Sequence, residues 1–177
     1  MSQNRKNILI IGMTGVGKTT IGRLIAKKLN KKFFDSDHEI ELASGLRIND
    51  FFTKFGEKEF RKLEKKIITK LINQNKNIVI STGAGFLSNT KFNKFVFSES
   101  ICIFLNAKIE TLYQRLIGNI RNRPKLNEGN LKENLKKMHK SRTQEYMNAQ
   151  IKIEVDELSI ADILTLILDY LKENERI

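Results

Sequence analysis

The sequence predicts a single α/β domain in which a parallel sheet is covered by helices on both faces. Three observations support this class. Short aliphatic segments alternate with longer segments of helical periodicity along the 177 residues. No repeat, linker or change of composition divides the chain. Hydrophobic residues make up 40% and charged residues 29% of the sequence, as in compact globular domains.

Five segments have the composition of buried strands. Residues 7–12 (NILIIG), 77–82 (NIVIST) and 100–105 (SICIFL) are almost entirely apolar. Residues 31–35 (KKFFD) and 151–156 (IKIEVD) are shorter runs with more polar residues. Because parallel strands are buried on both faces, near-continuous apolar runs are typical of them. We therefore expect one sheet of five parallel strands.

Segments of helical spacing separate these strands, and helices are expected over 17–29, 37–73, 108–116, 131–147 and 159–173. The segment 37–73 is broken near Gly45 and Gly56. Ser159, followed three residues later by Asp162, predicts the N-cap of the last helix. Four aromatic residues of the long segment are expected to anchor the core: Phe51, Phe52, Phe55 and Phe60.

Composition limits the partners and the location of the protein. The net charge of +12 permits nucleic acid, an anionic membrane or an anionic small substrate. The basic residues are spread along the chain without an aromatic stacking motif, so we expect neither a specific nucleic acid nor a membrane partner. No apolar run approaches the roughly 20 residues needed to span a bilayer, and no secretory segment is evident. A cytoplasmic location is expected.

Residues that often bind metals or form disulfides are few. Cys102 is the one cysteine, and its apolar surroundings predict a buried core residue. His38 and His139 are far apart in the sequence, so they are interpreted as solvated or structural.

The strongest motif is GMTGVGKTT at Gly12–Thr20, which satisfies G-x-x-x-x-G-K-[ST] between a predicted strand and a predicted helix. Its glycines let successive backbone N–H groups turn inward around phosphate oxygens, and the helix N-terminus adds a positive dipole. Lys18 is expected to reach the β- and γ-phosphates of ATP, and Thr19 to bind Mg²⁺. The expected nucleotide-binding residues are Gly15, Val16, Gly17, Lys18, Thr19 and Thr20.

Polar residues follow the other predicted strands, and the carboxyl ends of parallel strands meet at one edge of a sheet. Asp35 and Asp37 follow the second strand, 83–85 (GAG) follow the third, and Asp156 ends the fifth. Asp35 is a candidate ligand of Mg²⁺, directly or through water. Asp37 is a candidate for binding the hydroxyls of an acceptor substrate, and it is also placed to cap the following helix.

Three further sites are unspecific when taken alone. Arg61 and Glu64 are three residues apart on a predicted helix, a spacing typical of surface ion pairs. Arg123 lies in the polar segment 117–130, interpreted as a mobile loop, and Arg142 lies on a later helix.

The ordered set GMTGVGKTTIGRLIAKKLN, FFDSDHEIE, FGEKEFRKLE, STGAGF, RNRPKL and SRTQEY resembles the shikimate kinase family over nearly the whole chain. The resemblance implies a single-domain P-loop kinase with sheet order 2-3-1-4-5 and a mobile lid at about 117–130, and we expect a monomer. It implies ATP- and Mg²⁺-dependent phosphorylation of the 3-hydroxyl of shikimate.

The resemblance also assigns roles to single residues. It implies that shikimate is bound by Asp37, by the backbone of Gly83, Ala84 and Gly85, and by a clamp of Arg61 and Arg142 on its carboxylate. Glu64 would orient Arg61, and Arg115 would lie near adenine. Asp37, Lys18 and Arg123 are the implied catalytic residues, with Arg123 also on the nucleotide phosphates.

Three positions depart from the family pattern. Ala84 replaces the middle glycine of a triplet, where a left-handed backbone would be strained by a Cβ atom. Pro124-Lys125-Leu126 replaces a proline followed by two leucines, and the proline often found after Arg142 is missing. Two alternatives stay open: another small-acceptor kinase, such as a gluconate kinase, and a non-enzymatic nucleotide-binding regulatory protein.

Overall fold

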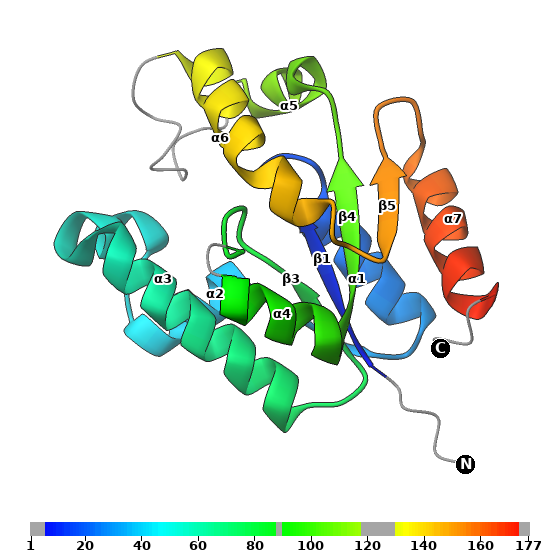
Figure 1. The fold of residues 1–177 in the computed structure, drawn as a ribbon, viewed down its shortest axis with the longest axis horizontal. Helices are drawn as coiled ribbons and strands as arrows, with labels where there is room; N and C mark the ends of the chain where they lie inside the picture. The colour runs from blue at the N-terminus through cyan, green and yellow to red at the C-terminus, as the bar shows by residue number, and fades with distance from the viewer. Residues whose placement is uncertain (1–5, 88–89, 118–129, 174–177) are drawn as a thin grey trace.

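A five-stranded parallel sheet forms the centre of the computed structural model, which describes residues 6–87, 90–117 and 130–173 (Figure 1). The strand order is β2-β3-β1-β4-β5, so the predicted class and order are confirmed. The strands are β1 (Asn7–Gly12), β2 (Lys32–Asp35), β3 (Ile78–Ser81), β4 (Ser100–Asn106) and β5 (Ile151–Glu154). β1, β3 and nearly all of β4 are buried, which explains their uninterrupted aliphatic sequences.

Helices cover both faces of the sheet. In the described residues they are α1 (Lys18–Lys28), α2 (Ser36–Ser44), α3 (Ile48–Gln74), α4 (Thr90–Glu99), α5 (Ile109–Leu116), α6 (Leu131–Tyr146) and α7 (Ile160–Glu173). α1 and α7 pack together on one face, and α3, α4 and α6 lie on the other (Figure 1). α4 was not predicted, because its Phe-rich sequence has low helix propensity and its helical period is short.

The predicted break points of the long helical segment are confirmed. α2 ends at Gly45, which has φ 69°, and α3 is kinked at Gly56, which has φ 76°. Both values lie in the left-handed region that glycine adopts without a Cβ penalty. α2 and the first part of α3 therefore form a separate helical pair beside the edge strand β2.

Three of the four phenylalanines expected in the core are confirmed there. Phe51 and Phe60 are buried, and Phe52 packs on Phe60 with ring centroids 4.4 Å apart. The prediction for Phe55 is wrong, because its side chain is 45% exposed. It immediately precedes the kink at Gly56, and its ring contacts that of Phe51 with centroids 4.9 Å apart.

Several smaller predictions are also settled. Cys102 is fully buried, and burial raises the pKa of its thiol well above the ordinary value. Ser159 and Asp162 cap α7 reciprocally: the Ser159 N–H donates to Asp162 Oδ2 at 3.1 Å and the Asp162 N–H donates to Ser159 Oγ at 3.2 Å. In the described part of the chain, no helix combines the length and apolarity needed to cross a membrane.

The strand register brings three chain segments to one edge of the sheet. Asp35 pairs with Ser81, and Ser81 pairs with Ile10 two residues before the end of β1. The loop after β1, the acidic end of β2 and the turn after β3 are therefore neighbours. This arrangement is what assembles the candidate site.

Candidate active site

The loop Gly12–Thr20 joins β1 to α1 and has the conformation expected of a phosphate-binding loop. Gly15 and Gly17 have φ values of 79° and 108°, in the region that favours glycine. Lys18 folds over the loop, and its ammonium group donates to the carbonyl of Met13 at 2.8 Å. The loop thus presents backbone N–H groups, a helix N-terminus and a cation to the same space, which suits a polyphosphate.

This loop forms one wall of a cavity of about 290 Å³. The opposite wall is built by Asp35, Asp37, Ser81 and Ala84. A single cavity therefore joins the predicted phosphate-binding loop to both predicted acidic residues, so a donor and an acceptor would meet inside it.

Thr19 and Asp35 form a group of oxygen atoms suited to Mg²⁺. The Thr19 hydroxyl donates to Asp35 Oδ2 at 2.8 Å and lies 3.3 Å from the hydroxyl oxygen of Ser81. Hydroxyl and carboxylate oxygens are the hard ligands that Mg²⁺ prefers, and it keeps several waters when bound this way. The donor set therefore fits the expected metal, and Ser81 is a neighbour that the sequence did not single out.

The first turn of α2 separates the roles of the two aspartates. Asp35 is the N-cap, and its Oδ1 atom accepts the N–H of Asp37 at 3.1 Å. The alternative in which Asp37 caps the helix is therefore wrong, and its exposed carboxylate faces the cavity.

The turn after β3 approaches the acidic residues so closely that a side chain at its first position would displace them. A Cβ atom on Gly83 would lie 2.5 Å from Glu64 Oε1 and 2.8 Å from Asp37 Oδ1. The Gly83 N–H donates to the hydroxyl of Ser36 at 2.9 Å, which fixes the turn to the start of α2. Ser36 is fully buried, and it is a further site residue that the sequence analysis missed.

The last position of the same turn lies against two arginines. A Cβ atom on Gly85 would lie 2.9 Å from Arg142 Nη2 and 3.0 Å from Arg61 Nη2. The two guanidinium groups come from α3 and α6, which are far apart in sequence. Arg61 and Arg142 thus converge as the clamp requires, while Asp37 lies at the other end of the turn.

The middle residue, Ala84, is compatible with this turn. Among the described residues, Asn30 and Asn77 are the only non-glycine positions with positive φ. The strain expected for a left-handed alanine is therefore absent at Ala84, and its backbone N–H stays available at the cavity wall.

Charged side chains of both signs surround the turn. Arg61 and Glu64 form a buried ion pair, and Glu57 lies 3.5 Å from the Arg61 Nε atom. The pKa of Glu64 is raised to about 7, mainly because its carboxyl is buried; Arg61 opposes this rise, and Asp37 contributes to it. Burial lowers the pKa of Arg142, and neighbouring Arg61 lowers it further. The guanidinium groups of Arg61 and Arg142 converge at the Gly85 end of the turn, and paired guanidinium groups favour binding of a carboxylate there.

Two residues predicted to contact the nucleotide, Val16 and Arg115, lie on the other side of the loop. The Arg115 Nη1 atom donates to the carbonyl of Val16 at 3.2 Å, so Arg115 lies at the phosphate-binding loop. The side chain of Val16 is buried, leaving only its backbone for a ligand. Asp156 instead caps α5, accepting from the Lys108 N–H at 2.9 Å and the Thr111 hydroxyl at 2.5 Å.

Comparison with known proteins agrees with this geometry. The model of the family "Shikimate kinase" matches residues 14–172. The chain belongs to the shikimate kinase family. The shikimate kinase of Pelotomaculum thermopropionicum is 36% identical, with 97% of this chain and 99% of that protein covered. The shikimate kinase of Thermodesulfovibrio yellowstonii is 37% identical, with 97% of this chain and 96% of that protein covered.

Solved structures separate this family from the other kinases considered. A shikimate kinase from Acinetobacter baumannii, solved in complex with shikimate, has a TM-score of 0.91 at 33% identity, covering 97% of this chain and 96% of that one. A gluconokinase from Sinorhizobium meliloti has a TM-score of 0.57 at 16% identity, covering 97% of this chain and 95% of that one. At this low identity, the likeness shows a shared fold alone.

One predicted part of the shikimate kinase site is not placed. Arg123 and nearly all of the segment 117–130, including Pro124, lie outside the described residues. The roles expected for Arg123 and for a lid therefore stay predictions. The other predicted residues of the site all surround the cavity, the turn after β3 or the phosphate-binding loop.

Proposed function

We propose that this protein transfers the γ-phosphoryl group of ATP to the 3-hydroxyl of shikimate, giving shikimate 3-phosphate and ADP. Membership of the shikimate kinase family supports the reaction. The observation that carries the proposal is the pair of arginines at Gly85, opposite Asp37 at Gly83. An acceptor with a carboxylate at one end and hydroxyls at the other fits this distribution of charge.

In this proposal the acceptor lies along the turn 83–85. Arg61 and Arg142 bind its carboxylate through planar contacts that can each form two hydrogen bonds, and Glu64 holds Arg61 in place. Asp37 accepts hydrogen bonds from the hydroxyls, including the one that attacks phosphorus. Backbone N–H groups of the turn, including that of Ala84, complete the acceptor site.

On the donor side, the phosphate-binding loop orients the triphosphate. Lys18 neutralises charge on the β- and γ-phosphates, and Arg123 is assigned the same role on the transferred group. Thr19 and Asp35 would hold Mg²⁺, and the bound ion would supply charge neutralisation at the phosphates. Arg115 is assigned to the adenine side of the loop, and Thr20 and the loop glycines complete the nucleotide site.

Alignment of donor and acceptor supplies most of the catalysis, because phosphoryl transfer requires little covalent assistance. Asp37 orients the 3-hydroxyl and accepts its proton as the bond to phosphorus forms. Exclusion of water from the cavity prevents hydrolysis of ATP in place of transfer.

The test is ADP release from ATP·Mg²⁺ with and without shikimate, for the wild type and for Asp37→Asn. We expect shikimate-dependent turnover that falls by at least about 100-fold in Asp37→Asn, since the variant loses both the base and a hydroxyl contact. ATP affinity should be unchanged. ATP binding without stimulation by shikimate would refute the proposal, and stimulation by gluconate instead would indicate another acceptor class.

We further propose that the protein acts as a cytoplasmic monomer without nucleic-acid or membrane partners. The spread of its basic residues along the chain supports the part of this proposal that concerns nucleic acid and membranes. Size-exclusion chromatography with light scattering and an RNA titration at varied salt are the relevant measurements. A dimer, or RNA affinity that falls steeply with salt, would contradict it.

A further inference from the structure

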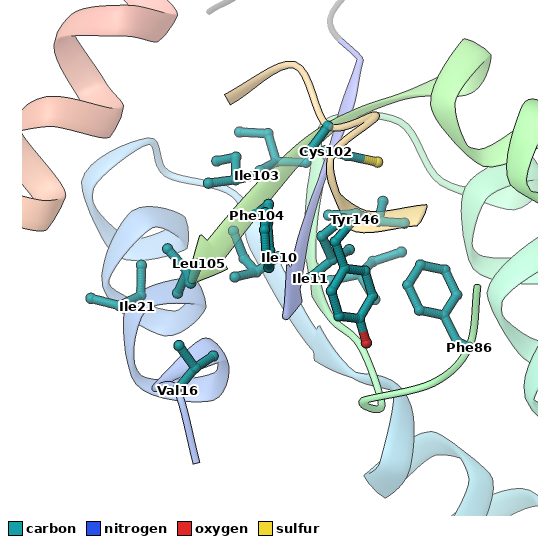
Figure 2. Close-up of a cluster of buried hydrophobic side chains, with 14 of the residues drawn as sticks. Ile10, Ile11, Val16, Ile21, Phe86, Cys102, Ile103, Phe104, Leu105 and Tyr146 are labelled. Carbon is teal, nitrogen blue, oxygen red and sulfur yellow. The ribbon is translucent and has the colours of Figure 1, made fainter. Parts of the chain in front are cut away.

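Tyr146, the last residue of α6, has a buried hydroxyl that the packing of the core does not explain. The residue is 1% exposed, and its ring lies 5.2 Å from that of Phe104 on β4. Figure 2 shows its hydroxyl pointing in the direction in which β1 and β4 run, toward the edge of the sheet that bears the site. Among the described residues, this hydroxyl has no hydrogen-bond partner. Buried tyrosine hydroxyls are normally bonded, so this one calls for an explanation.

Arg142 lies one helical turn before Tyr146, a spacing that places the two side chains on the same face of α6. The two terminal nitrogens of Arg142 have different surroundings. Nη2 faces the turn after β3, at 2.9 Å from a Cβ atom on Gly85, whereas Nη1 is enclosed and without a partner in the described structure. One end of the guanidinium therefore meets the acceptor site and the other points into the protein.

Glu64 supplies a third enclosed atom, because its Oε1 likewise has no hydrogen-bond partner in the described ranges. The three groups are electrostatic neighbours. The pKa of Tyr146 is raised to about 12, mainly because its hydroxyl is buried; Arg142 and Arg61 oppose this rise, and Glu64 contributes to it. Arg142 Nη1 is a hydrogen-bond donor, Glu64 Oε1 is a hydrogen-bond acceptor, and the Tyr146 hydroxyl can act as either. These three groups lie together behind the arginines of the substrate clamp.

We propose that Tyr146 is a positioning residue for acceptor recognition, whose hydroxyl accepts a hydrogen bond from Arg142 Nη1, directly or through one enclosed water, in the acceptor complex. The inference rests on the proposed function. A guanidinium recognises a carboxylate through a planar fork, so its orientation must be fixed at the end remote from the ligand. Tyr146 fixes that end, and an enclosed water would find the two to four polar partners that such waters require.

The test is Tyr146→Phe, which keeps the ring contact with Phe104 and removes only the hydroxyl. We expect the KM for shikimate to rise about tenfold, as for loss of a hydrogen bond to a charged group, with the KM for ATP unchanged. The Tm should stay within about 2 °C of the wild type, because the free protein loses no hydrogen bond.

Tyr170→Phe is the matched control. Its hydroxyl donates to the carbonyl of Gln150 at 3.1 Å, in the contact between α7 and the start of β5. Loss of this bond should lower the Tm and leave the KM for shikimate unchanged. The two tyrosine variants therefore separate an effect on acceptor binding from an effect on stability.

Tyr146→Phe with a wild-type KM for shikimate would overturn the inference, whether or not the Tm falls. A second measurement uses the background Arg142→Lys, in which the hydroxyl has no fork to orient. In that background, Tyr146→Phe should change the KM for shikimate little further, since the effects of two residues that act through one another are not additive. A full additional loss would overturn the inference. A wild type that shikimate does not stimulate would instead contradict the proposed function, and this inference with it.

Discussion

Gly83→Ala tests the geometry of the acceptor site most directly. The added Cβ atom would lie 2.5 Å from Glu64 Oε1 and 2.8 Å from Asp37 Oδ1. To restore a contact of 3.4 Å, these oxygens must move by about 0.9 Å and about 0.6 Å. A displacement of about 1 Å in a catalytic constellation costs on the order of 100-fold in rate. We therefore expect kcat/KM for shikimate to fall about 100-fold, and stability to fall by about 1–3 kcal/mol from overpacking.

The assay is ADP release at varied shikimate, with thermal unfolding and ATP binding measured on the same preparations. Gly45→Ala is the control, because Gly45 has φ 69° and a Cβ atom there meets nothing within 4 Å. It should lose about 1–2 kcal/mol of stability from backbone strain while keeping its activity. Wild-type kcat/KM in Gly83→Ala would refute the close approach of this turn to Glu64 and Asp37.

Two further predictions concern groups beside this turn. Because burial raises the folded-state pKa of Glu64 from 4.5 to about 7, its contribution to stability is complete below pH 4.5 and is lost as pH rises through 7. The unfolding free energy of the wild type should fall relative to that of Glu64→Gln across this pH range, by up to about 3 kcal/mol. An equal pH dependence of the unfolding free energy in the two proteins, measured by denaturation at several pH values, would contradict this. Ser36→Ala leaves the buried Gly83 N–H unpaired, which should cost about 1–3 kcal/mol of stability. The KM for shikimate should rise, and the KM for ATP should not. An unchanged melting curve would argue against the hydrogen bond between Gly83 and Ser36.

The nucleotide side of the site was predictable because its signals are local. A phosphate-binding loop needs glycine, lysine and threonine at fixed spacing within a few residues, and Gly15, Gly17 and Lys18 satisfy this directly. Asp35 and Asp37 were predictable from their place at the end of a strand, since parallel strands end at one edge. Which of them caps α2 was not, because the sequence does not define the start of the helix to within two residues.

The acceptor side depends on contacts between distant segments, which periodicity does not encode. Arg61 and Arg142 belong to different helices, and only the resemblance to a family, not their spacing, brought them together. Ser36 and Tyr146 were missed because burial of a hydroxyl leaves no mark on the sequence. Phe55 was misplaced because the kink at Gly56 changes which face of α3 is covered.

The central position of β1 has a consequence for the newly made chain. β1 is synthesised first, yet its partners in the sheet are β3 and β4, and its Asn7 accepts the backbone N–H of Ile78, 71 residues later in sequence. The phosphate-binding loop therefore leaves the ribosome long before the strands that flank it, while the aliphatic β1 has no neighbour to pair with. Because ATP stabilises only the folded state, we expect it to stabilise this protein during synthesis only after β3 and β4 have emerged, and β1 to be exposed to aggregation until then.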